Sequence, residues 1–148
     1  MLFALTCVLS GAAAMLSPKR PGRHPTFGAV YFWSLTGVAL TTCALAAARW
    51  SEDYALFLIA ALSFALALLG RQARRRQWRG WARWHISGMG ASYIVMLTAF
   101  YVDNGKNLPI WRDLTPLAYW LAPSMVGLPI LSVALLRHPL ARGSAAPR

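Results

Sequence analysis

Long apolar runs constrain this chain more than any other feature of its sequence. Five of them approach the ~20 residues that a helix needs to cross a bilayer. They occupy approximately residues 1–17, 26–48, 54–70, 84–102 and 115–136. A chain of 148 residues has too small an interior to bury so much apolar surface in water. We therefore predict an all-α fold, a membrane-spanning bundle of about five helices that forms one domain over residues 1–148.

Charged residues are scarce and mostly basic. They make up 13% of the chain, against about 25% in a soluble protein, and the net charge is +11. In a soluble protein such a charge would suggest nucleic-acid binding. Here the basic residues lie between the apolar runs, where they orient membrane helices. We therefore expect the bilayer, and not a nucleic acid, to be the partner.

The charges also predict an orientation. Segments 18–24, 71–83 and 137–148 hold twelve basic residues and no acid, whereas all four acids lie in the alternate segments. Because basic segments stay in the cytoplasm, we predict an outside N-terminus and a cytoplasmic C-terminus in a bacterial inner membrane. The basic segments are expected to bind anionic lipid headgroups.

The two ends of the chain differ in character from the segments between them. Ala12, Ala13 and Ala14 resemble the cleavage region of a signal peptide, but no positive charge precedes the first apolar run. We therefore expect a retained helix. The tail, residues 142–148, consists of small residues, proline and arginine, and we predict that it is disordered.

The three histidines lie at predicted helix ends. His24 precedes Pro25, which suits the first position of a helix, and His85 lies near the start of the fourth run. Both helices run from inside to outside, so the two rings have similar depth. A helix N-terminus disfavours a cation, which leaves the neutral ring that ligates metals. His138 follows Arg137 at a helix C-terminus, where the dipole favours the cation, and we interpret it as an anchor.

A glycine lies one helical turn beyond each of the first two histidines. Gly28 follows His24 by four residues and Gly88 follows His85 by three, so each pair shares a helix face. A bare turn lets a flat group approach the backbone. We therefore predict haem b, with the two histidines as iron ligands. The arginines expected to pair with its propionates are Arg20, Arg23 and Arg83.

Three further interpretations compete with this one. Glycines at such spacing also pack membrane helices tightly, which favours a non-catalytic subunit or assembly factor that binds a membrane protein partner or a second copy. A transporter is disfavoured because no acid lies within an apolar run. A zinc site formed by His24, His85 and His138 lacks a fourth ligand. No residue pattern identifies an enzyme.

Two segments carry a resemblance to a known family. Residues 22–32 read GRHPTFGAVYF, and residues 81–94 read WARWHISGMGASYI. With AFYVDNGKNLPIW and YWLAPSMVGLPI further on, the chain resembles a family of predicted bacterial multi-pass membrane proteins known only as a domain of unknown function. The similarity extends from Pro21 to Pro139.

The family pattern has a histidine and a following glycine that open one helix, and a second histidine after a Trp/Arg-rich loop. His24, Gly28 and His85 match it, whereas many members have an arginine where this chain has Gly88. The resemblance implies a membrane topology but no activity. The paired histidines are also similar to those of four-helix b-type cytochromes, which is an analogy only.

Overall fold

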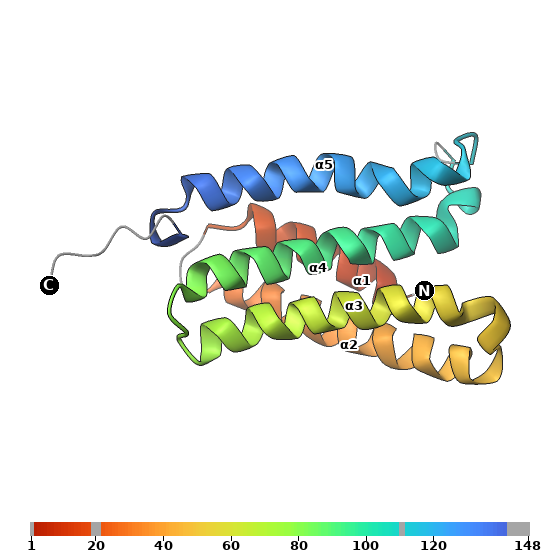
Figure 1. The fold of residues 1–148 in the computed structure, drawn as a ribbon, viewed down its shortest axis with the longest axis horizontal. Helices are drawn as coiled ribbons and strands as arrows, with labels where there is room; N and C mark the ends of the chain where they lie inside the picture. Colours follow the sequence, from red (N-terminus) through yellow and green to blue (C-terminus); the bar gives the residue numbers. More distant parts are fainter. Residues whose placement is uncertain (1, 19–21, 110–111, 142–148) are drawn as a thin grey trace, which may run out of the picture. The chain divides into compact units, whose positions relative to one another are not determined.

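The computed structural model describes residues 2–18, 22–109 and 112–141, without the side chains of residues 51, 52 and 140. Over this part of the chain the structure is all-helical, as predicted (Figure 1). Its elements are α1 (Leu2–Leu16), α2 (Arg23–Ala48), α3 (Trp50–Arg75), α4 (Trp81–Asn104), the 3₁₀ turn η1 (Gly105–Asn107), α5 (Pro116–Arg137) and the 3₁₀ turn η2 (Pro139–Ala141). The predicted tail, residues 142–148, lies outside the described residues.

Four of the described helices are long and apolar enough to cross a membrane, namely 23–48, 53–75, 81–107 and 116–137. Only 11% of the most apolar part of α5 is buried, so most of that surface requires an apolar solvent. The chain is a multi-pass membrane protein. The 15 residues of α1 span ~22 Å, less than the ~30 Å hydrocarbon core, and a complete crossing by α1 stays a prediction.

Three of the helices, α2, α3 and α4, begin earlier than the apolar runs suggested. α2 begins at Arg23, after Gly22 with φ 116°, so Pro25 is its third residue and not its first. Proline is tolerated there because the first-turn N–H groups have no partner within the helix. α4 begins at Trp81, after Gly80 with φ 71°. His24 is therefore the second residue of α2, and His85 is the fifth residue of α4.

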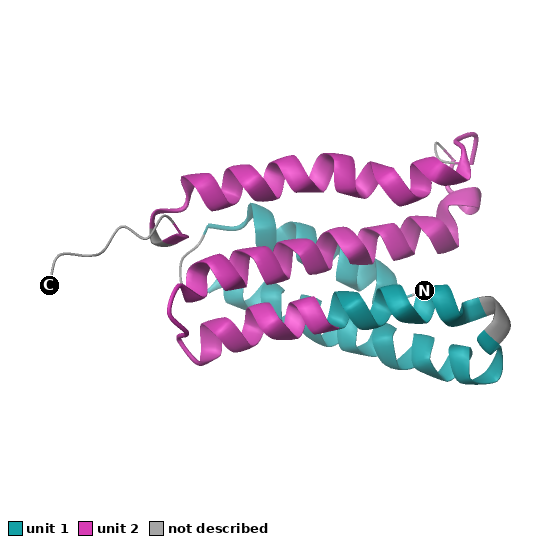
Figure 2. Ribbon diagram, viewed as in Figure 1, with its two compact units in different colours: residues 1–64 teal, residues 65–148 magenta. Residues whose placement is uncertain are grey.

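The chain divides into two compact units, residues 1–64 and residues 65–148 (Figure 2). α3 contributes its first part to unit 1 and its last part to unit 2.

Unit 1 is built on an antiparallel contact between α1 and α2. Phe3, near the start of α1, lies against Gly37 of α2, where an added Cβ would come within 2.9 Å of the ring. Cys7 of α1 and Tyr31 of α2 are buried, and the Cys7 thiol points to the Tyr31 carbonyl oxygen, 3.8 Å away. The rings of Phe32 and Phe64, with centroids 5.8 Å apart, join α2 to the first part of α3.

Unit 2 is held together by glycines at the helix contacts. α4 packs antiparallel to the end of α3, where a Cβ added to Gly88 would come within 2.8 Å of the Gly70 Cα and within 2.7 Å of the Leu66 carbonyl oxygen. α4 also packs against α5, where Gly127 receives the side chain of Ile94. Helices that lack a hydrophobic driving force between them associate through such close backbone contacts.

These contacts predict opposite effects for two glycine substitutions. Gly88→Ala places a methyl group against the α3 backbone and is expected to lower the free energy of unfolding by about 1–3 kcal/mol. Gly28→Ala is the matched control, because a Cβ there meets no atom within 4 Å. It is expected to raise stability by about 0.4–1 kcal/mol. Thermal unfolding of both variants in one detergent measures the difference, and equal midpoints would contradict the packing described for Gly88.

Candidate functional site

His24 joins the start of α2 to the end of α1. Its Nδ1 lies 2.8 Å from the carbonyl oxygen of Ala14. In a continuous helix that carbonyl would accept a hydrogen bond from residue 18, but Pro18 has no N–H. Because a carbonyl only accepts, Nδ1 carries the proton and donates it. The imidazole thus supplies a donor where the sequence removes one.

His85 makes an equivalent contact in unit 2. Its Nδ1 lies 3.0 Å from the carbonyl oxygen of Gly70 in α3. The Trp81 ring lies one turn earlier on α4, with its centroid 6.4 Å from that of His85. Nδ1 is again the donor, since its partner is a carbonyl. Each histidine therefore ties the beginning of one helix to the preceding antiparallel helix.

This hydrogen bond determines which ring nitrogen can bind a metal. When a neutral imidazole donates through Nδ1, its lone pair resides on Nε2. Histidines that ligate metals commonly donate their other N–H to a backbone carbonyl, which fixes the ring and raises its basicity as a ligand. His24 and His85 are both half-buried and share this tautomer. The predicted pair of ligands thus has one common chemistry, with one member in each unit.

The two glycines beside the histidines differ. A Cβ at Gly28 would meet no atom within 4 Å, so the backbone of α2 is open to close approach at this position. The space beside Gly88 is occupied by the backbone of Gly70 and Leu66 in α3. The packing interpretation therefore accounts for Gly88, and the open turn that a flat group needs is found at Gly28.

The predicted arginine partners surround the histidines in the sequence. Arg23 and Arg83 are exposed, the first directly before His24 and the second two residues before His85. Arg20 lies outside the described residues. Both described arginines thus have exposed side chains, and their pairing with propionates stays a prediction.

His138 forms the C-cap of α5, where its backbone N–H donates to the Ala134 carbonyl at 3.1 Å. Its Nδ1 is buried and has no hydrogen-bond partner among the described residues. His138 thus lacks the carbonyl contact that His24 and His85 share. Within the described chain no three His, Cys, Asp or Glu side chains form a group that could hold a metal ion, so the three-histidine zinc site gains no support.

The carbonyl partners of the histidines were not predicted from the sequence. For Ala14 a signal was present, because Pro18 stands four residues later and withholds a donor. For Gly70 no local signal exists, since it lies within α3, which continues to Arg75. Its pairing with His85 depends on how α3 and α4 pack.

The hydrogen bonds predict a graded loss of stability when each ring donor is removed. His24→Phe and His85→Phe are each expected to lower the free energy of unfolding by about 0.5–1.5 kcal/mol. The effect is larger for His24, because Pro18 cannot serve the same carbonyl. His138→Phe, the control, is expected to be neutral or stabilising because its Nδ1 has no described partner. Thermal unfolding in detergent measures the order, and a reversed order would refute it.

Comparison of the chain with protein-family models, with curated proteins and with solved structures gave no match.

Proposed function

We propose that this protein is a small b-type haem protein of the bacterial inner membrane that binds iron through His24 and His85. Its role is electron transfer or the handling of haem. The observation that supports the proposal is the shared Nδ1 hydrogen bond to a backbone carbonyl, at 2.8 Å for His24 and 3.0 Å for His85. Each ring is held in a tautomer that leaves Nε2 available to haem iron.

The residues around the histidines have separate tasks in this proposal. Nε2 of each ring is the ligand atom, and the carbonyl contact orients the ring and increases its basicity. Gly28 gives a flat ring system access to the backbone beside His24. Arg83, which is exposed, would bind a propionate. Bound haem would supply one-electron redox chemistry, whose potential depends on these ligands and on burial.

A visible spectrum tests this function. The full chain, purified after expression with haem supplied, is expected to show a Soret band that His24→Ala and His85→Ala remove or shift and that His138→Ala leaves unchanged. Added imidazole should restore the band in the variants if the histidines act as ligands. A low-spin ferric spectrum would show that one iron takes two imidazoles, and a high-spin spectrum would show single ligation.

Two results would overturn the haem proposal. The first is a protein without a Soret band despite supplied haem, and the second is a band that neither histidine substitution alters. Either result would leave association through helix packing as the explanation of the histidine and glycine contacts.

We also propose that the N-terminus lies outside and the C-terminus in the cytoplasm. The turn between α3 and α4 supports this orientation, because Arg74, Arg75, Arg76 and Arg79 are all exposed there. The far end of α4 instead precedes Asp113, which pairs with Arg112 at 3.7 Å. Basic segments are retained on the cytoplasmic side.

Fusions to alkaline phosphatase test the orientation. The enzyme is expected to be inactive when it is fused after Gly80, in the basic turn, and active when it is fused after Pro109, beyond η1. Expression levels of the two fusions, measured by immunoblot, provide the control. The opposite pattern of activity would invert the proposed topology.

A further inference from the structure

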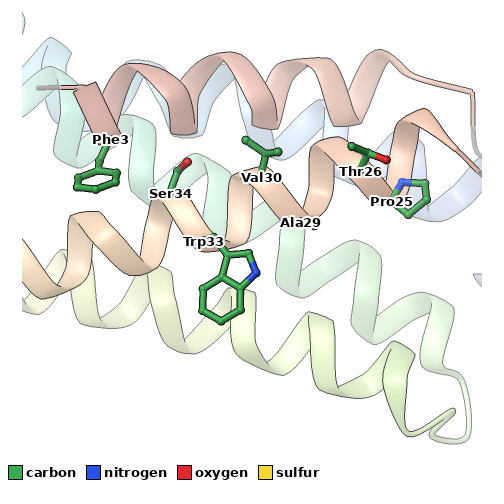
Figure 3. Close-up of a pocket in the computed structure, with 7 residues that line it drawn as sticks. All are labelled: Phe3, Pro25, Thr26, Ala29, Val30, Trp33 and Ser34. Atoms are coloured by element: carbon green, nitrogen blue, oxygen red, sulfur yellow. The ribbon is translucent and has the colours of Figure 1, made fainter.

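An open groove of about 700 Å³ follows α2 in unit 1 (Figure 3). Its lining comes from α2 between Pro25 and Ser34 and from Phe3 of α1. The groove contains neither His24 nor Gly28, so it is separate from the candidate haem ligands. Its position within a membrane-spanning helix places it at the level of lipid chains.

The walls of the groove suit a hydrocarbon chain. Trp33 and Val30, which are 64% and 39% exposed, present apolar surface to the surroundings. Thr26 is one of two hydroxyl residues in the lining, and its Oγ donates to the Gly22 carbonyl at 2.9 Å. That hydroxyl is therefore satisfied within its own helix, as such groups usually are in membrane helices.

The length of the groove matches one leaflet. Pro25 and Ser34 are nine residues apart in α2, which is ~14 Å along a helix and about half of the ~30 Å hydrocarbon core. The Phe3 ring lies against Gly37, one turn beyond Ser34, and forms the inner end. Because Gly37 has no Cβ to displace this ring, Phe3 can lie against α2 at this end of the groove.

A positive charge lies next to the Pro25 end of the groove. α2 begins at Arg23, two residues before Pro25, and the Arg23 side chain is exposed. The acidic residues of unit 1, Glu52 and Asp53, follow the opposite end of α2 in the chain. An anionic headgroup at Arg23 therefore meets a cation without a neighbouring carboxylate in the sequence.

We propose that this groove binds one acyl chain of an anionic phospholipid from the leaflet at the Arg23 end. The phosphate is held by Arg23, the chain lies along Val30 and Trp33, and its terminus meets Phe3. Charge complementarity selects the headgroup, and the Phe3 ring limits the chain length. Arg23 is also a predicted propionate partner, so the Val30 variant, which leaves Arg23 unchanged, is the one that separates this site from haem binding.

Native mass spectrometry of the full chain tests the headgroup. The protein is exchanged in mild detergent with equal amounts of phosphatidylglycerol and phosphatidylcholine that carry identical chains. Retention of phosphatidylglycerol is expected to be about fivefold higher, as one arginine near a membrane surface predicts. Arg23→Gln should lower this preference and Arg23→Lys should keep it. Equal retention of both lipids by the unaltered chain would overturn the proposal.

Substitutions within α2 test the groove itself. Val30→Trp fills the groove and should eliminate the retained lipid, whereas Leu40→Trp, at a 65% exposed position outside it, should not. Phe3→Ala removes the end wall and should shift retention toward longer chains in a phosphatidylglycerol mixture. Circular dichroism confirms that the variants are folded. Equal retention by the Val30 and Leu40 variants, or unchanged chain length with Phe3→Ala, would refute the assignment.

The haem spectrum of the same samples separates the two proposals. In the Val30→Trp variant, loss of lipid retention with an unchanged Soret band would locate the effect in the groove. Loss of the band with retained lipid would concern the histidines alone.

Discussion

The absence of water from the bilayer interior is the constraint on which this structure depends. Each backbone group within the hydrocarbon core must find its partner inside the protein, so the spanning segments are helices. The difficulty moves to the helix ends, where carbonyls lose their donors. At the end of α1 the loss is compounded by Pro18, and the His24 ring donates to Ala14 instead. The histidine that the sequence suggested as a metal ligand thus closes a helical hairpin.

A second consequence of the bilayer is that helices must be attracted to each other by contact and not by exclusion from water. The α3–α4 and α4–α5 contacts accordingly depend on glycines, which have no side chain. Gly70 and Gly88 bring two backbones together, and Gly127 accepts the side chain of Ile94. The same close approach of α3 to α4 brings the Gly70 carbonyl within 3.0 Å of His85. The contact between α3 and α4 therefore brings two backbones together and also gives the His85 ring its hydrogen-bond acceptor.

The sequence predicted the helices well because hydropathy reports directly on the lipid environment. It was less accurate at helix starts, since residues such as Arg23 and Trp81 belong to the helix but not to the apolar run. It also treated Gly28 and Gly88 alike, because spacing from a histidine specifies a face of the helix but not what covers that face. Only the packing of α3 separates the open glycine from the filled one. The acceptor at Gly70 was beyond prediction for the same reason.

The structural role of the histidines and their proposed role as iron ligands are chemically compatible. A ring that donates through Nδ1 to close a hairpin must keep its remaining lone pair on Nε2 when it is neutral. The structural hydrogen bond therefore selects the tautomer that a metal requires and restricts rotation of the ring. His138 has no such described contact at Nδ1, so no described hydrogen bond at that atom fixes the tautomer of its ring. Helix closure alone explains the hydrogen bonds of His24 and His85, and iron ligation would use the nitrogen that closure leaves in its basic form.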